Sequence, residues 1–286
     1  MNIKYRISPD TPAGPTDMGA LRELVRRMER GDGTVPARGL VLGCPALDDA
    51  LPEGGLALGR VHEVLGPARS DVRDAAAFGF TIALLALLMK ARPQEGPVIW
   101  CPRSANLLGG TLYIRGLVGL GLDADRLILV ETRDEAERVW ALEEALSTKG
   151  VLAALAELDP VRADRRDNKT NRRLQLAAER SGVTGFLLRP RMTTASGAAA
   201  RTTTLVESRW QVSAAPSPLG PHDARPVWSV LLERAKRARR LASEPRRIAW
   251  DAPHMSFFEV FDRPAAAAQD PLVPETRGDR RYGRVA

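Results

Sequence analysis

The loop at residues 66–75, GPARSDVRDA, lies where a nucleotide-binding protein would bind phosphate, between a short apolar run and a helical pattern. A working phosphate loop has the pattern G-x-x-x-x-G-K-[ST]. Its backbone N–H groups surround the phosphates, the lysine contacts the outer phosphates, and the hydroxyl binds Mg²⁺. Counted from Gly66, the second glycine is Asp71, the lysine is Val72 and the hydroxyl residue is Arg73. We therefore predict a degenerate phosphate loop, with no nucleotide cofactor and no ATPase activity.

Acidic residues in the same loop suit the start of a helix. Asp71 and Asp74 are spaced as an N-cap residue and an N3 acid, so their carboxylates would accept hydrogen bonds from the helix N-terminus. Internal carboxylates would then occupy the position that phosphate takes in a nucleotide-binding protein. Arg69 and Arg73 keep the loop from being uniformly acidic, so weak phosphate binding stays open.

Metal and redox chemistry have little support in the sequence. The two cysteines, Cys44 and Cys101, are far apart and have no partners at metal-ligand spacing, so we expect reduced thiols in or near the core. His62, His222 and His254 do not belong to a cluster of carboxylate or cysteine ligands. We expect no metal site.

Positive charge is concentrated in the C-terminal third. The chain carries a formal net charge of +7, and residues 225–249 hold eight basic residues against two glutamates. Such a segment fits an anionic partner, either nucleic acid or an acidic protein surface, and a solvated basic surface is the alternative. The candidates for partner or DNA contact are Trp228, Arg234, Lys236, Arg237, Arg239, Arg240, Arg246, Arg247 and Trp250.

The five tryptophans divide into two groups. Trp100 and Trp140 lie on apolar faces, and we expect both in the core. Trp210, Trp228 and Trp250 lie in or beside the basic segment, where they would act as interface anchors or base-stacking platforms. Core packing is an equal alternative for Trp210 and Trp228.

The elements that must position these residues alternate along the chain. Short, nearly continuous apolar runs are typical of strands buried on both faces of a parallel sheet. They occur at residues 61–65, 98–101, 127–130, 151–156 and 185–188. Helical patterns lie between them at 74–91, 105–120, 133–149 and 168–181. Thr132 and Glu135 have the spacing of a capping box, and Gly150 and Gly182 follow two helices. This alternation predicts a doubly wound, mostly parallel α/β sheet.

Three regions follow from the patterning. Residues 1–39 are predicted to be a flexible segment with an amphipathic helix at 16–30. Residues 40–240 form the predicted core, whose runs 201–212 and 225–234 are expected to pair as an antiparallel extension. Residues 241–286 show little periodicity and are predicted to be a largely disordered basic tail that binds a partner.

Membrane insertion is not expected. The longest apolar stretch, residues 78–89, is well short of the ~20 residues that a membrane-spanning helix needs. The N-terminal residues lack the hydrophobic core of a signal peptide, so we expect a cytoplasmic protein.

Residues 43–67 resemble the start of a RecA-like ATPase core. The stretch contains an LD-x-AL helix, a Gly54-Gly55 turn, and a strand in which Glu63 stands two residues from the start. The succession of strands and helices continues the resemblance to about Val212. It implies a RecA-like fold.

The catalytic positions of that family are altered here. RecA-like ATPases place a water-activating glutamate after the second strand, and this chain has Arg103 near that position. An acid after the fourth strand would hold magnesium, and Glu157 and Asp159 are available there. Since the loop lacks its lysine and hydroxyl, we expect these two acids to be a solvent-exposed pair at a strand end.

Among RecA-like proteins the chain is most similar to the ImuA family. The residues that carry this resemblance are GRVHEVLGP (59–67), RRLQLAAERSGVTGFLLRP (172–190) and the run from ESRWQV to RPVWSVLLERAK (207–236). It implies a non-catalytic accessory protein of the SOS-type DNA damage response. Its implied partners in translesion synthesis are the Y-family-related protein ImuB, an error-prone replicative-type polymerase and RecA. The alternatives are a RecA-like ATPase with a variant phosphate loop and a DNA-binding module that uses the basic segment.

Overall fold

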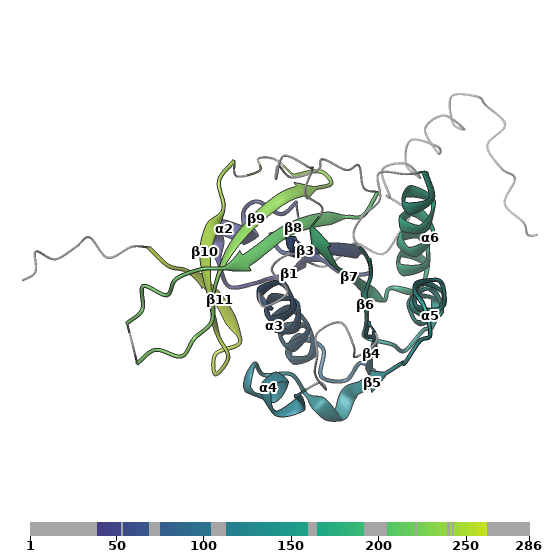
Figure 1. Cartoon of the computed structure of the whole chain (residues 1–286), viewed down its shortest axis with the longest axis horizontal. Coiled ribbons are helices and arrows are strands. Elements are labelled where there is room, and N and C mark those ends of the chain that lie inside the picture. Colours follow the sequence, from purple (N-terminus) through teal and green to yellow (C-terminus); the bar gives the residue numbers. More distant parts are fainter. Residues whose placement is uncertain are drawn as a thin grey trace, which may run out of the picture.

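The computed structural model of the chain (Figure 1) describes residues 39–52, 54–68, 75–103, 113–159, 165–191, 205–220, 222–238, 241 and 243–261. Several predicted features lie outside these ranges. They are the amphipathic segment 16–30, the loop residues Asp71, Val72 and Arg73, the basic residues Arg239 and Arg240, and the tail from 262 onward.

A nine-stranded mixed sheet runs through the molecule in the order β11-β10-β9-β8-β3-β7-β6-β4-β5 (Figure 1). The strands from β8 to β5 in this order are mutually parallel, which confirms the predicted α/β sheet. These parallel strands are β3 (Val61–Ala68), β4 (Val98–Cys101), β5 (Leu127–Leu129), β6 (Ala153–Glu157), β7 (Thr184–Arg191) and β8 (Ser208–Ala214). Each predicted apolar run therefore coincides with a strand.

Helices cover both faces of the parallel part (Figure 1). Helix α3 (Ala76–Ala91) packs on β3, β7 and β8, and it is buried almost all round because the segment from Leu40 to Leu56 joins the same hydrophobic cluster. Helices α5 (Glu135–Ser147) and α6 (Arg165–Ser181) pack against each other and cover the opposite face. The doubly wound arrangement follows from these two layers.

Shorter elements complete the parallel part. They are β1 (Gly39–Leu40), β2 (Leu56–Ala57), α2 (Pro45–Asp48), α4 (Ile114–Gly119) and a 3-10 turn, η2 (Ala124–Arg126). The predicted Gly-Gly turn lies between α2 and β2. Gly54 has φ +67°, and a Cβ on Gly55 would lie 2.5 Å from the carbonyl oxygen of Leu40, so both positions require glycine.

The capping box of α5 lies two residues later than predicted. Asp134, rather than Thr132, is the N-cap, and its side chain accepts from the N–H of Glu137 at 2.8 Å. The Glu137 carboxylate in turn accepts from the N–H of Arg133 at 2.8 Å. The predicted N3 acid, Glu135, accepts instead from the N–H of Asp159, so it is committed to another contact.

The C-terminal part of the sheet confirms one prediction and corrects another. The two predicted strands pair as expected, because β8 is antiparallel to β9 (Val227–Ala235), while β3, the other neighbour of β8, is parallel to it. The extension continues beyond residue 240 with β10 (Arg246–Asp251) and β11 (Ser256–Glu259). The folded domain therefore extends to about Val260, past the predicted boundary.

An aromatic cluster explains why these late strands fold. The Phe80 ring on α3 lies 5.3 Å from the Phe257 ring, and the Trp250 and Phe257 ring centroids are 4.6 Å apart. Trp228 packs against the same rings, and Gly79 on α3 leaves room for its indole. The prediction missed this burial because β10 and β11 are short and carry charged residues at their ends.

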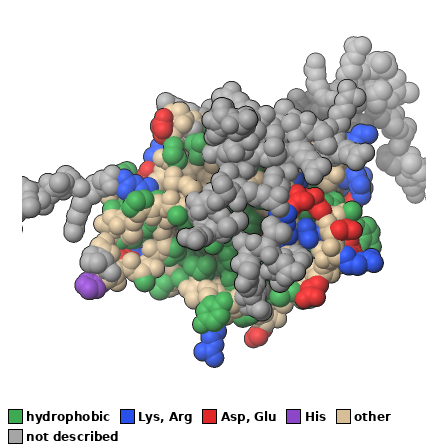
Figure 2. All heavy atoms as spheres, viewed as in Figure 1, with side chains coloured by type: hydrophobic (Ala, Val, Ile, Leu, Met, Phe, Trp, Pro, Cys, Tyr) green, Lys and Arg blue, Asp and Glu red, His purple; other side chains and the backbone are tan. Residues whose placement is uncertain are grey.

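One of the two tryptophans that we expected in the core lies at the surface. Trp100 and Trp210 are buried, but Trp140 is 59% exposed on the outer face of α5. Hydrophobic side chains also project from the rim of the molecule at α4 (Figure 2). Within the described residues, no helix has both the length and the apolar character needed to cross a bilayer.

Candidate functional site

The carboxyl ends of the parallel strands form the candidate site, because ligands of open α/β sheets bind at this edge. Strand β3 leads from here into the loop at 69–74, which lies outside the described residues. Gly66 is buried near the end of β3, where a Cβ would lie 3.3 Å from the Cβ of Ala77 on α3. The close approach of strand and helix therefore accounts for this glycine without a phosphate.

A buried ion cluster lies near the start of β3, on the side of the sheet that α5 and α6 cover. Glu63 Oε2 accepts from Arg209 Nε at 2.7 Å, and Glu63 Oε1 lies 3.3 Å from Arg189 Nε. Strand register places these residues together, since Glu63 is directly opposite Arg209 on β8 and Arg189 on β7 pairs with Leu65. All three side chains are fully buried.

The network continues across the sheet to Asp159, which follows β6. Arg189 Nη1 donates to the carbonyl oxygen of Asp159 at 3.0 Å, just after β6. The Asp159 carboxylate forms an ion pair with Arg103, which follows β4. Its backbone N–H donates to Glu135 Oε1 of α5 at 2.8 Å. Ion pairs and hydrogen bonds thus connect β8, β3, β7, β6 and β4, from the start of β8 to the residues that follow β6 and β4.

Glu157, the last residue of β6, is held in the same region. Its Oε1 accepts from Trp100 Nε1 at 3.0 Å, and its Oε2 accepts from the N–H of Arg103 at 3.3 Å. Burial raises the pKa of the Glu157 carboxyl. Burial also raises the pKa of Glu135, and the neighbouring Asp159 carboxyl adds to this. Glu157 and Asp159 are therefore engaged inside the protein and are not the solvent-exposed pair that we predicted.

The carboxylates at the end of β6 and just after it already have partners within the chain. Arg103, near the position of the water-activating glutamate, is the ion partner of Asp159, so a cation stands where a base would be needed. A carboxylate that binds a guanidinium is a poor ligand for magnesium, which requires oxygen ligands free to coordinate it. Among the described residues, no group of three or more His, Cys, Asp or Glu side chains could hold a metal ion.

Comparisons with known proteins identify the family. No family model matches the chain. Two proteins named ImuA, from two strains of Caulobacter vibrioides, are each 41% identical to it over 220 residues, which cover 74% of this chain and 84% of theirs. The chain belongs to the ImuA family. This confirms the resemblance that the sequence motifs indicated.

The fold of this ImuA-family chain is also found among solved structures. The crystal structure of the RadB recombinase matches it with a TM-score of 0.51 and 16% sequence identity. The match covers 78% of this chain and all of the recombinase chain. It confirms the RecA-like α/β fold that we predicted.

The predicted contact residues of the basic segment do not form one surface. Trp228 and Trp250 are buried, at 4% and 0% exposure, so the structure places both in the core rather than at an interface. For Trp228 this is the core-packing alternative, and for Trp250 it corrects the prediction of an interface anchor or stacking platform. Trp250 Nε1 donates to the carbonyl oxygen of Leu120 at 3.0 Å, and its polar atom is thereby satisfied.

Several basic side chains of the segment have acidic partners. Lys236 Nζ lies 3.8 Å from Glu207, and burial lowers the pKa of this lysine. Arg246 donates to Glu259 at 2.7 Å, and Arg247 is half-buried. Arg234 and Arg237 are exposed. The positive charge available to a partner is therefore smaller than the sequence count indicates.

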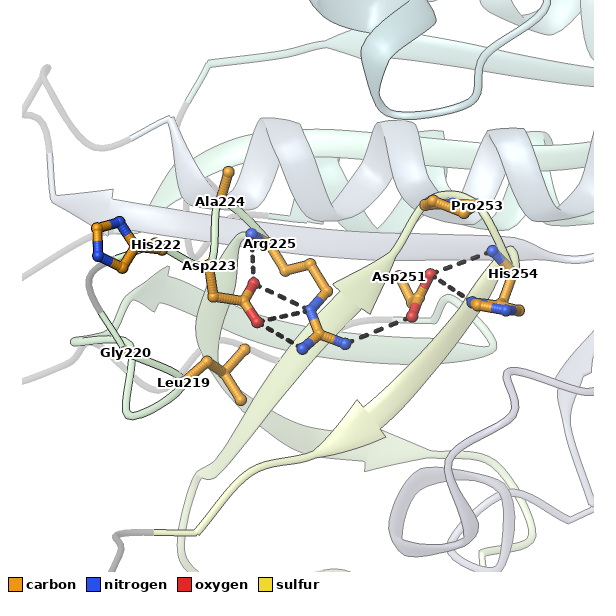
Figure 3. A pocket seen from close by; sticks show the side chains of 9 residues that line it. All are labelled: Leu219, Gly220, His222, Asp223, Ala224, Arg225, Asp251, Pro253 and His254. Carbon is orange, nitrogen blue, oxygen red and sulfur yellow. Dashed lines mark hydrogen bonds and ion pairs between the residues drawn. The ribbon is translucent and has the colours of Figure 1, made fainter.

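An open hollow of about 640 Å³ lies beside the start of β9 and the turn between β10 and β11 (Figure 3). Arg225 lies at its centre, with its Nε 3.0 Å from Asp223 Oδ1 and its Nη1 3.4 Å from Asp251 Oδ2. His254 Nδ1 is 2.9 Å from the other oxygen of Asp251. Hydrogen bonds from Arg225 lower the pKa of Asp223 to about 2. These groups satisfy one another and give no sign of a catalytic site.

Proposed function

We propose that this chain is a non-catalytic, RecA-like adaptor in DNA-damage-induced translesion synthesis and mutagenesis. In this role it recruits or regulates an ImuB-type protein and an error-prone DNA polymerase, and RecA is a further candidate partner. Membership of the ImuA family supports the pathway. The partners are inferred from the family resemblance.

The observation that carries the non-catalytic part is the ion network that runs across the parallel strands to the residues that follow β6 and β4. Glu63, Asp159 and Glu157 are engaged by Arg209, Arg189, Arg103 and Trp100. The sequence of the adjoining loop has no lysine and no Ser or Thr at the positions that bind phosphate and Mg²⁺. Both observations favour an architecture that binds macromolecules over one that hydrolyses a nucleotide.

The exposed end of β9 is our candidate for the partner surface. Arg234 and Arg237 are exposed there, and Arg239 and Arg240 follow in the sequence. Arg237 has φ +61°, a conformation that a non-glycine residue adopts rarely, so the turn is held in a defined shape. Two exposed arginines, one at the end of β9 and one on the turn that follows it, suit an acidic protein surface.

A charge-reversal experiment tests this assignment. The double variant Arg234→Glu and Arg237→Glu should weaken binding to an ImuB-type protein on the order of tenfold. The matched control, Arg133→Glu with Lys149→Glu, makes the same charge change at the two ends of α5 and should bind as the parent does. Equal affinity of both double variants would show that the end of β9 is not the contact.

The DNA-binding alternative has its own test in the same proteins. Phosphate contacts would make the affinity for DNA fall steeply with salt, and the β9 double variant would reduce that slope. A flat salt response would favour the protein contact. The pairing of Lys236 and Arg246 with glutamates supports the protein contact.

A further inference from the structure

The exposed face of α6 carries a row of basic side chains. They are Lys169, Arg172, Arg173 and Arg180, and all four are exposed. Leu174 and Ala178 of the same helix are buried in the cluster that α6 shares with the sheet, so by helical periodicity the basic residues lie on the outer side. Figure 2 shows Lys and Arg side chains on the side of the molecule that α6 occupies in Figure 1. We call these four residues the α6 basic row.

The row has the length and the charge to follow a nucleic-acid strand. Lys169 and Arg180 stand at its two ends, and at 1.5 Å per residue the row is about 16 Å long. Successive phosphates of one DNA strand are separated by about 3.4 Å along the helix axis, so this length spans several of them. Among the described residues, only Arg173 of this row has an acidic partner, Glu143 of α5.

The pair between Arg173 and Glu143 connects the row to α5. Arg173 Nε donates to Glu143 Oε1 at 3.1 Å, and the Arg173 side chain is still 62% exposed. An ion pair that is this exposed contributes little to stability, so a phosphate could replace the carboxylate at small cost. The outer faces of the two helices therefore form one continuous surface.

An exposed aromatic side chain lies next to that pair. Trp140 precedes Glu143 by one helical turn, so the two side chains are neighbours on the surface of α5. Trp140 is 59% exposed, whereas each of the other four tryptophans is at most 4% exposed. Proteins that bind single strands combine basic side chains along the backbone with aromatic rings on which bases stack. The outer face of α5 and α6 has both components.

Acidic side chains beside Trp140 restrict the path of an anionic strand. Glu137 lies one turn before Trp140 and Glu144 lies one turn after it. Glu137 is paired with Arg133, and Glu144 is exposed. These carboxylates would repel phosphates, so a bound strand would keep its backbone on α6 and direct its bases over α5.

We propose that the outer face of α5 and α6 binds single-stranded DNA, with the phosphates along the α6 basic row and a base stacked on Trp140. A duplex keeps its bases stacked inside the helix and has no free ring face to offer the indole. An acidic protein segment that covered Trp140 would bring its carboxylates close to Glu137 and Glu144, whereas a base is uncharged. A single strand therefore fits the charges better than either alternative.

Binding at this surface would not depend on base sequence, because phosphates and ring faces are common to all nucleotides. The site lies on other elements than the proposed protein contact at the end of β9. The two proposals therefore succeed or fail separately, and the chain could hold DNA and a protein partner at the same time.

Fluorescence anisotropy of a dye-labelled oligodeoxythymidine of about 20 nucleotides, titrated with the full chain, tests the row. The variant Arg172→Gln with Arg180→Gln removes two phosphate contacts and should lower the slope of log affinity against log salt by about 1.4. The matched control, Arg115→Gln with Arg234→Gln, removes the same charge from exposed positions on α4 and β9 and should keep the slope. An equal fall in both double variants, or no binding by the parent protein, would overturn the proposal.

The emission of Trp140 tests the stacking contact. Bound oligonucleotide should protect this exposed indole from quenching by acrylamide. Trp140→Ala should weaken binding on the order of tenfold, and Trp140→Phe should keep most of the affinity, because a phenyl ring also stacks on a base. Both variants should fold as the parent does, since the side chain is exposed. If Trp140→Ala bound as tightly as the parent, no base would stack on Trp140.

Competition experiments identify the class of partner. A DNA duplex of the same length and a polyglutamate peptide of the same charge are each titrated against the bound oligonucleotide. The proposal predicts that each displaces it only at concentrations on the order of tenfold higher than an unlabelled single strand does. Displacement by polyglutamate as readily as by the single strand would assign the surface to an acidic protein, and equal displacement by the duplex would assign it to a double helix. Either result would overturn the proposal.

Discussion

Glu63 and Arg209 face each other across β3 and β8, with their side-chain atoms 2.7 Å apart and both side chains buried. Glu63 lies near the start of β3, the strand that leads into the phosphate loop, and Arg189 forms an ion pair with its other oxygen. In a nucleotide-binding protein this strand would lead into the phosphate-binding loop. Here the ion pairs of Glu63 connect it to both neighbouring strands, β7 and β8. The chain's own charges fill this part of the sheet.

Loss of Arg209 should destabilise the fold. The change Arg209→Met keeps most of the side-chain volume but leaves Glu63 with only Arg189 as its ion partner. Removal of one member of a buried ion pair costs about 3–5 kcal/mol of unfolding free energy. Urea denaturation followed by circular dichroism measures this loss.

The control for that experiment is Arg133→Met on the surface of α5. Arg133 is 89% exposed and pairs with Glu137 at i,i+4, so its removal should cost less than about 1 kcal/mol. If both variants lost the same small amount, the buried cluster would not be a stabilising feature of the sheet.

The C-terminal hairpin should behave as part of the core. Phe257 is fully buried against Phe80 and Trp250, so Phe257→Ala should cost about 3–5 kcal/mol in thermal or urea unfolding. Phe261, four residues later, is 72% exposed, and Phe261→Ala should be nearly neutral. If Phe257→Ala were nearly neutral, β10 and β11 would not be part of the folded core.

Acid should weaken the fold through His62. This histidine is buried: its Nε2 donates to Ala57 O and its Nδ1 accepts from Ser208 Oγ, each at 2.7 Å. Burial lowers its pKa from 6.5 to about 4. Between these pH values the unfolded chain binds more protons, so the contribution of His62 is complete above pH 6.5 and is lost as the pH falls toward 4.

A comparison with His62→Gln isolates this effect from other titrating groups. The difference in unfolding free energy between parent and variant should shrink by roughly 3 kcal/mol between pH 7 and pH 4. Denaturation curves collected across this range measure the difference. Parallel pH profiles of the two proteins would mean that His62 does not titrate differently in the folded state.

The parallel sheet was predictable from sequence, and the site network was not. Strands such as VIWC and GFLL are apolar throughout because both of their faces are covered, and this local property is visible in the residues themselves. The Glu63–Arg209 pair joins residues 146 positions apart and depends on strand register. The signal in the sequence was a charged residue between apolar residues in each strand, Glu63 in VHEVL and Arg209 in SRWQV, which indicates a buried partner without naming it.

The predictions for the β10–β11 hairpin and for Trp140 were wrong for a related reason. The strand RRIAWD has only three apolar residues and begins with two arginines, so its burial depends on contacts such as that of Trp250 with Phe257 and not on its own pattern. Trp140 has apolar neighbours in sequence, but the buried face of α5 is set by Leu142, Ala145 and Leu146. The local sequence pattern does not show whether another element of the fold packs against a residue.

Calorimetric titration of the full chain with Mg-ATP tests the central claim most directly. If the chain's own ion pairs fill the carboxyl edge and the loop lacks its phosphate-binding groups, the titration should show no saturable heat up to millimolar nucleotide. Saturable binding in the micromolar range would contradict this account and would support the alternative of an ATPase with a variant loop.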